Sequence, residues 1–99
     1  MATKGAAGTL RDVRAKFDGD VISLHVFFAG HEIPMSQSGS TWKGRKSYDV
    51  AGKVHAELVF KAPAGTDYKF VLSVDGAEKI KCDGTSAAAL FSRGCDVEV

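Results

Sequence analysis

The sequence predicts an all-β protein, a single-domain antiparallel β-sandwich of six to seven strands. Apolar and polar residues alternate with a period of two along most of the chain, and Asp-Gly pairs separate the alternating segments. The chain has 99 residues, close to the commonest size of one domain. One-sided alternation is what an antiparallel sheet with a single buried face requires. We expect residues 1–9 to form a flexible N-terminal segment and residues 10–99 to form the sandwich.

Six segments carry the alternation, and in each we expect every second side chain to face the core. Between two of them, Asp75-Gly76 predicts a two-residue hairpin, because Asp-Gly readily adopts the positive φ values of tight turns. Asp18-Gly19 and Asp83-Gly84 also punctuate the pattern. The expected inward sets are Val13, Ala15 and Phe17; Ile22, Leu24, Val26 and Phe28; Val54, Ala56, Leu58 and Phe60; Tyr68, Phe70, Leu72 and Val74; Ile80 and Cys82; and Cys95, Val97 and Val99.

The segment GTSAAALFSRG, residues 84–94, departs from this alternation. A Ser/Thr cap, a run of alanines and a closing glycine favour a short helical turn between the last strands. The alternative is a strand whose small residues lie under a tight packing site.

Composition limits the classes of partner. The net charge is +1, with 44% hydrophobic and 25% charged residues, which is an ordinary globular mixture. No global field attracts the chain to nucleic acid or anionic lipid, and no apolar run is long enough to span a membrane, so we expect neither partner. Without a secretory signal at the start, we expect either a cytoplasmic protein or a mature secreted domain with an added Met.

The two cysteines, Cys82 and Cys95, are too far apart for a CxxC redox motif or a zinc knuckle. Two interpretations remain open. They are buried free thiols, which behave as small apolar residues, or they form a disulfide between neighbouring strands that stabilises the fold by about 3 kcal/mol.

The stretch PAGTDYKFVLSVDG, Pro63 to Gly76, resembles the corner and following hairpin of immunoglobulin-like and fibronectin-type-III-like sandwiches. The resemblance implies an immunoglobulin-like sandwich in which the hydroxyl of Tyr68 bonds back to upstream backbone. The stretch is also similar to a hairpin of starch- and glycogen-binding sandwich modules. Those modules place a sugar-stacking aromatic after the turn, where this chain has Ala77 and Glu78.

The segment SQSGSTWKGRKSYD, residues 36–49, contains the only tryptophan and the densest basic cluster. One interpretation is a strand–loop–strand unit in which Trp42 packs into the core and the cations are simply solvated. The other is a loop that offers an aromatic face to a sugar ring and cations to phosphate or carboxylate. The candidate ligand-binding residues are Trp42, Lys43, Arg45, Lys46 and Tyr48.

The histidines raise a possible metal site. If their strands are neighbours, His25 and His55 meet near Glu57, a set that suits zinc or copper. Solvated histidines on a sheet face are the simpler interpretation, and we expect no metal and no cofactor.

The leading function is therefore a non-catalytic binding module for carbohydrate or a small polar ligand. The sequence contains no nucleophile elbow, HExxH, Walker or Rossmann motif, so we expect no enzyme. The alternative is a structural or protein–protein interaction domain, which includes a homo-oligomer. It would use an edge strand or an outer sheet face bearing Phe27, Val59 and Val71.

Overall fold

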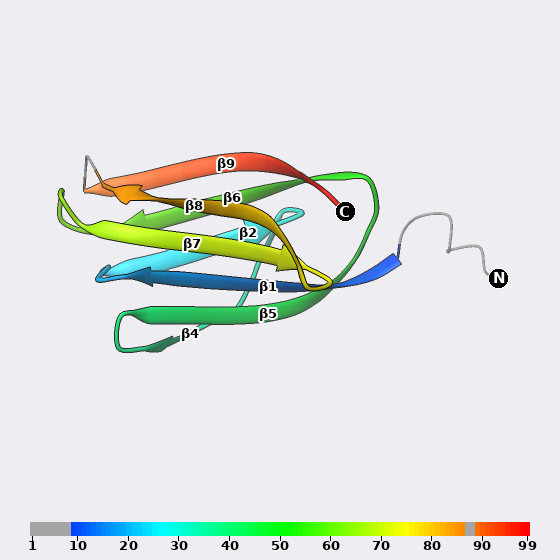
Figure 1. Cartoon of the computed structure of the whole chain (residues 1–99), viewed down its shortest axis with the longest axis horizontal. Coiled ribbons are helices and arrows are strands. Elements are labelled where there is room, and N and C mark those ends of the chain that lie inside the picture. The colour runs from blue at the N-terminus through cyan, green and yellow to red at the C-terminus, as the bar shows by residue number, and fades with distance from the viewer. Residues whose placement is uncertain (1–8, 87–88) are drawn as a thin grey trace.

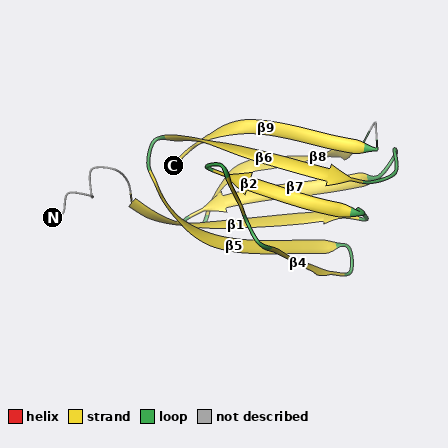
Figure 2. Ribbon diagram, turned by 180° about the vertical axis from the view of Figure 1, so that it is seen from behind, coloured by secondary structure: helices red, strands yellow, loops and turns green. Residues whose placement is uncertain are grey.

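A computed structural model describes residues 9–86 and 89–99 of the chain. The described residues form two antiparallel sheets packed face to face and contain no helix, so the all-β sandwich is confirmed (Figures 1 and 2). Accordingly, this part of the chain contains no helix long and apolar enough to cross a membrane. The nine strands are β1 (Thr9–Gly19), β2 (Ser23–Phe28), β3 (His31–Glu32), β4 (Met35–Ser38), β5 (Thr41–Val50), β6 (Lys53–Lys61), β7 (Asp67–Val74), β8 (Ala77–Thr85) and β9 (Leu90–Glu98).

The strand order places β1 at the centre of the larger sheet. That sheet has the order β4-β5-β1-β7-β8, and the smaller one has the order β3-β2-β6-β9. The hairpins β2–β3, β4–β5 and β7–β8 stay within a sheet, whereas every other connection passes from one sheet to the other. Figure 1 shows β1 lying between β5 and β7, with β2, β6 and β9 in the opposite layer.

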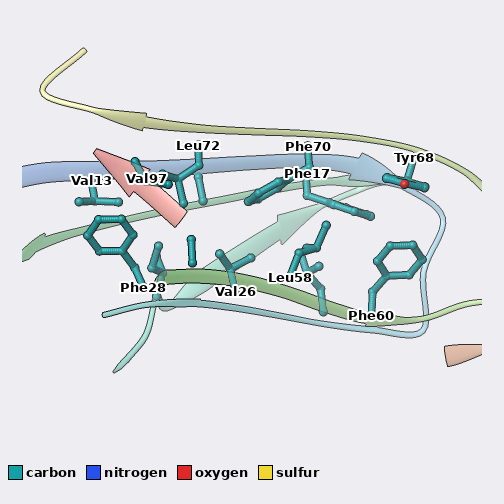
Figure 3. Close-up of a cluster of buried hydrophobic side chains, with 14 of the residues drawn as sticks. Val13, Phe17, Val26, Phe28, Leu58, Phe60, Tyr68, Phe70, Leu72 and Val97 are labelled. Atoms are coloured by element: carbon teal, nitrogen blue, oxygen red, sulfur yellow. The ribbon is translucent and has the colours of Figure 1, made fainter. Parts of the chain in front are cut away.

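The core lies between the sheets, where the alternating apolar side chains meet (Figure 3). Phe17 and Phe60 are fully buried with ring centroids 5.2 Å apart, and the ring of Tyr68 lies 5.2 Å from that of Phe60. Burying one such side chain stabilises the fold by roughly 1.5–3 kcal/mol. The expected inward faces of β1, β6 and β7 are confirmed.

One predicted core residue is wrong. Ile22 is 76% exposed, because β2 begins one residue later and Val21 takes the buried position before it.

The six alternating segments did not include β3, β4 and β5. β4 and β5 correspond to the strand–loop–strand interpretation of residues 36–49, which the structure favours over a binding loop. β3 and β4 are only 2 and 4 residues long. β5 has 10 residues, but Gly44 and Lys46 occupy its inward positions, so neither of its faces is uniformly apolar. Pairing with β1 over its whole length nevertheless holds it in the sheet.

The link between β3 and β4 crosses the inner side of β5 at Gly44. Ile33 of this link is fully buried. A Cβ atom on Gly44 would lie 2.5 Å from the carbonyl oxygen of Pro34 and 2.9 Å from Cγ2 of Ile33. The link therefore packs directly on the β5 backbone. A side chain at position 44 would push the link away from the strand.

The turns agree with the sequence in one case of three. Asp75-Gly76 forms the predicted two-residue hairpin, with φ of 51° and 83°, as a type I′ turn requires. Asp18-Gly19 instead ends β1 before a crossing between sheets, and Asp83-Gly84 lies inside β8. Ala29-Gly30, with φ of 55° and 80°, makes a second two-residue turn that the sequence did not reveal.

The expected helical turn over residues 84–94 is wrong where the structure describes it. Residues 84–85 belong to β8 and residues 90–94 to β9, because pairing with β7 and with β6, respectively, prevails over the local helix preference of this segment. Ala87 and Ala88, the centre of the predicted turn, lie outside the described residues.

Tyr68 packs as expected but does not make the expected hydrogen bond. Its ring is buried, yet no group in the described residues bonds to its hydroxyl. The carbonyl oxygen of Pro63 instead accepts hydrogen bonds from the hydroxyls of Thr66 at 2.6 Å and Ser86 at 3.1 Å. These two hydroxyls secure the corner before β7.

The cysteines are free thiols, so the disulfide alternative does not hold in this structure. Cys82 lies on β8 and Cys95 on β9, the edge strands of opposite sheets rather than neighbouring strands of one sheet. Both line a small cavity of about 50 Å³. Burial raises the pKa of the Cys82 thiol, which disfavours the reactive thiolate.

Candidate functional site

The strand β5 separates the five candidate residues onto two faces. Successive side chains of a strand point to opposite sides. Lys43 and Arg45 therefore lie on the outer face of the five-stranded sheet, whereas Trp42, Lys46 and Tyr48 lie on the opposite side of the strand. The structure does not bring these five residues together into one loop platform.

Trp42 belongs to the margin of the core. It is partly buried, packs against the core cluster and lies directly across from Phe17 of β1. Its Nε1 atom is buried and has no hydrogen-bond partner within the described part of the chain. The indole therefore serves the packing of the core, and its nitrogen is not accessible to a ligand.

Lys46 and Tyr48 line a separate hollow of about 470 Å³, together with His31. The Tyr48 ring is buried, its hydroxyl donates to the carbonyl oxygen of His31 at 3.2 Å, and burial raises the pKa of the phenol. Lys46 Nζ lies 5.7 Å from the centroid of that ring. The ring is thus held by internal contacts and capped by a lysine, which leaves little of it for a ligand.

The outer face of the five-stranded sheet brings together cations from strands far apart in the sequence. Arg14 and Lys16 alternate with the buried residues of β1, so they point outward. The register places Arg14 directly opposite Arg45 and Lys16 directly opposite Lys43. The outward charges on β1 are visible in the sequence, but no sequence signal shows that β5 pairs with β1 in this register.

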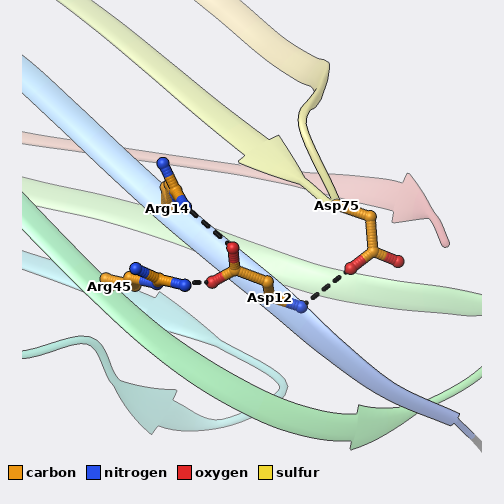
Figure 4. A network of polar contacts seen from close by, with 4 residues as sticks. All are labelled: Asp12, Arg14, Arg45 and Asp75. Carbon is orange, nitrogen blue, oxygen red and sulfur yellow. Dashed lines mark hydrogen bonds and ion pairs between the residues drawn. The ribbon is translucent and has the colours of Figure 1, made fainter.

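A carboxylate neutralises the arginine pair, whereas the lysine pair has no such partner among the described residues. The carboxylate of Asp12 accepts hydrogen bonds from Nε of Arg45 at 2.8 Å and from Nε of Arg14 at 3.2 Å (Figure 4). The Arg45 bond lowers the pKa of the Asp12 carboxyl, and Arg14 adds to this effect. Lys16 and Lys43, in contrast, make no ion pair with any described residue.

These four cations surround an open depression, which we call the basic hollow. Its volume is about 620 Å³. β4 supplies its far wall beyond β5, since Ser36 lies opposite Lys43. The lining consists of Arg14, Lys16, Pro34, Ser36, Lys43, Gly44 and Arg45, with no carboxylate among them.

The chemistry available in the basic hollow is the recognition of anions. Its lining holds four positively charged side chains and the Ser36 hydroxyl. It holds no histidine, cysteine or carboxylate that could act as a general base. A guanidinium binds carboxylate, sulfate or phosphate in a fork geometry, and lysine ammonium groups add point charges.

The histidines do not form the metal set considered from the sequence. β2 and β6 are neighbours, but His25 faces Val59, and each ring has a separate acidic partner. Nδ1 of His25 lies 2.7 Å from Glu32, and Nδ1 of His55 lies 3.1 Å from Asp96. The described residues contain no group of three or more potential metal ligands.

Only two of the three apolar residues expected to form an outer stripe share a face. Phe27 and Val59 are on the outer face of the smaller sheet, whereas Val71 is on β7 of the larger sheet. Each of the three is partly buried.

Comparison with known proteins found no relative. The chain matches no protein-family model, no curated protein and no solved structure.

Proposed function

We propose that this protein is a non-catalytic binding module whose basic hollow binds an anionic ligand. This proposal keeps the carbohydrate or small polar ligand expected from the sequence. It moves the contact from the Trp42 segment to the outer face formed by β1, β4 and β5. Of the five candidates, Lys43 and Arg45 remain in the proposed site.

The observation that carries the proposal is the unneutralised pair Lys16 and Lys43. Side chains directly opposite each other on antiparallel strands have Cβ atoms about 4.5–5.5 Å apart, and like charges there destabilise the sheet. Among the described residues no carboxylate pairs with either lysine, although Asp12 bridges the arginines in the next row. An anion bound between Lys16 and Lys43 supplies the negative charge that no described residue provides there.

The test uses substitutions whose effects on stability and binding have opposite signs. Lys16→Glu creates a cross-strand pair with Lys43, so it should stabilise the fold by about 0.2–1 kcal/mol. The same change should weaken binding of inorganic tripolyphosphate or a sulfated oligosaccharide, measured by calorimetry at low salt, by about tenfold or more. Adding salt should weaken wild-type binding through screening.

Lys46→Glu is the matched control, because it makes the same charge change on the opposite face of the sheet, on the neighbouring strand β5. It should leave the affinity within about twofold, a difference of ~0.4 kcal/mol. Equal losses in Lys16→Glu and Lys46→Glu would mean that only net charge matters, and would refute the proposed site.

The immunoglobulin-like assignment is retained as a proposal about architecture alone. Immunoglobulin domains place strands A, B, E and D in one sheet and C, F and G in the other. Here β1 and β2, the first two strands, lie in different sheets. What supports the likeness is the stacking of two antiparallel sheets rather than this strand order.

A second candidate function, protein–protein interaction, is favoured by one observation. Ile22 is 76% exposed and Leu90 is 60% exposed. Both flank Lys61 at one end of the smaller sheet: the Ile22 amide donates to the Lys61 carbonyl at 2.7 Å, and Leu90 pairs with Lys61 across β9. Light scattering tests the self-association version, which a concentration-independent monomer mass would eliminate.

A further inference from the structure

We propose that the anionic ligand is an acidic oligosaccharide that lies obliquely across the strands, with its acidic groups over the cations of β1 and β5 and its hydroxyl groups over the carboxylates of Asp67 on β7 and Asp83 on β8. This inference rests on the proposed function and specifies its ligand. It follows from three hollows that adjoin one another on the outer face of the larger sheet.

The hollows are continuous because neighbours share lining residues. The basic hollow shares Arg14 and Lys16 with a central hollow of about 340 Å³ over β1, β7 and β8. The central hollow shares Asp18 and Lys69 with a third hollow of about 540 Å³, which we call the acidic hollow. With neighbouring strands about 4.8 Å apart, a ligand that crosses from β4 to β8 spans roughly 19 Å. This length suits an oligomer better than a single small anion.

The charge changes sign along this path. The basic hollow has four cations and no carboxylate. The acidic hollow is lined by the carboxylates of Asp18, Asp67 and Asp83, with Lys69 as its one cation. The row Lys43–Lys16–Val71–Lys81 crosses from β5 to β8 and reaches the central hollow. The acidic hollow lies in the next outward row along the strands, Asp18–Lys69–Asp83.

A ligand that fits this path needs negative charge at one end and hydrogen-bond donors at the other. Hydroxyl groups donate to carboxylates, which accept hydrogen bonds but cannot donate them when ionised. Two of the three carboxylates already accept bonds from hydroxyls of the protein: Thr41 donates to Asp18 at 2.8 Å, and Thr85 donates to Asp67 at 2.7 Å. Asp83 has no hydrogen-bond partner in the described residues, so it is the acceptor left for a ligand hydroxyl.

Nucleic acid fits this path poorly. Its phosphates repeat along the whole strand, at one charge per ~3.4 Å, so they would also face the acidic hollow. Single-stranded forms bind by stacking bases on aromatic rings. The outward residues described on this sheet include no aromatic side chain, because Trp42, Tyr48, Phe17, Phe70 and Tyr68 all lie on its other face.

The experiment compares two probes of similar charge, a sulfated hexasaccharide and an inorganic polyphosphate without hydroxyl donors. Calorimetry at low salt measures both against wild type, Lys43→Glu and Asp83→Ala. Asp83 is exposed on β8, so its truncation should leave the fold intact, as thermal unfolding will verify. Lys43→Glu should weaken both probes by about tenfold or more.

The Asp83→Ala variant distinguishes the saccharide inference from the simpler proposal of an anion site. If hydroxyls of the saccharide donate to Asp83, its removal weakens saccharide binding by about tenfold or more, as loss of a hydrogen bond to a charged group predicts. The same variant should strengthen polyphosphate binding, because a repulsive charge has gone. Stronger binding of both probes would overturn the saccharide inference while the anion site stands. If neither probe binds the wild type, the proposed function fails and the inference with it.

Discussion

The backbone amide of Asp12 donates a hydrogen bond to Oδ1 of Asp75 at 2.9 Å, and Arg11 forms an ion pair with the other oxygen at 3.0 Å. The Asp75 amide returns a bond to the carbonyl oxygen of Asp12 at 2.8 Å. The turn between β7 and β8 is thereby tied to β1, next to the carboxylate that bridges Arg14 and Arg45.

The Asp75 contact should make stability depend on pH. The Asp12 amide, and then Arg11, lower the pKa of the Asp75 carboxyl in the folded state. A lowered folded pKa stabilises the fold above the unfolded value of about 4, and this contribution is lost as pH falls through the folded pKa. Asp75→Asn keeps a residue suited to the type I′ turn. Urea unfolding should therefore show a less stable variant at pH 7 and a difference that shrinks below pH ~4.

Asp20→Asn is the control, because Asp20 is exposed and makes no hydrogen bond in the described residues. It should show no such trend. A stability difference for Asp75→Asn that stays constant from pH 7 to pH ~2 would argue against the charged contact.

Asp12 should oppose ligand binding while it stabilises the fold. Its carboxylate occupies Arg14 and Arg45, the two guanidinium groups of the basic hollow. Asp12→Asn releases both cations, so anion affinity should rise by about twofold to fivefold while the melting temperature falls. Calorimetry and thermal unfolding of the same preparation measure both effects. An affinity that falls together with stability would show that the arginines need Asp12 to be positioned for the ligand.

Gly44 should tolerate no side chain. A Cβ atom there would overlap the carbonyl oxygen of Pro34 and Cγ2 of Ile33. Gly44→Ala should lower the free energy of unfolding by roughly 1–3 kcal/mol, the usual cost of overpacking. Gly84→Ala provides the comparison, because its nearest contact would be an ordinary 3.4 Å to the Tyr68 hydroxyl. Chemical denaturation of the two variants should separate them, and equal stabilities would place the β3–β4 link further from β5 than the structure shows.

The sequence predicted those parts of the fold that depend on local alternation. The inward face of β6 can be read directly from the sequence, because the two faces of this strand differ sharply in polarity. The inward residues are Val54, Ala56, Leu58 and Phe60. β5 appeared only as one of two interpretations of residues 36–49, since Lys46 and Gly44 interrupt its inward face. The sandwich could thus be predicted, whereas the strand order could not.

The candidate site was only half predictable for a related reason. Lys43 and Arg45 stand out in the sequence as part of a basic cluster. Their partners Arg14 and Lys16 come from β1, and only the pairing register places them opposite. A one-residue shift in that register would turn the same cations to the other face.

Trp42 should report on the core rather than on the ligand. Its ring packs against the core and its Nε1 is buried. Its emission should be blue-shifted and poorly quenched by iodide, and Trp42→Phe should bind anions as the wild type does. Trp42→Ala should cost roughly 2–3 kcal/mol of stability, less than a fully buried aromatic. A red, readily quenched emission that responds to an anionic ligand would restore the indole as part of the site.

The most direct test of the central claim is a map of backbone amide shifts by NMR during titration with a sulfated oligosaccharide. Binding at the basic hollow predicts that the largest saturable shifts fall on residues 14–16 of β1 and residues 43–45 of β5. The hollow around Lys46 and Tyr48 should change little. Shifts concentrated at that second hollow, or none that saturate, would contradict the account.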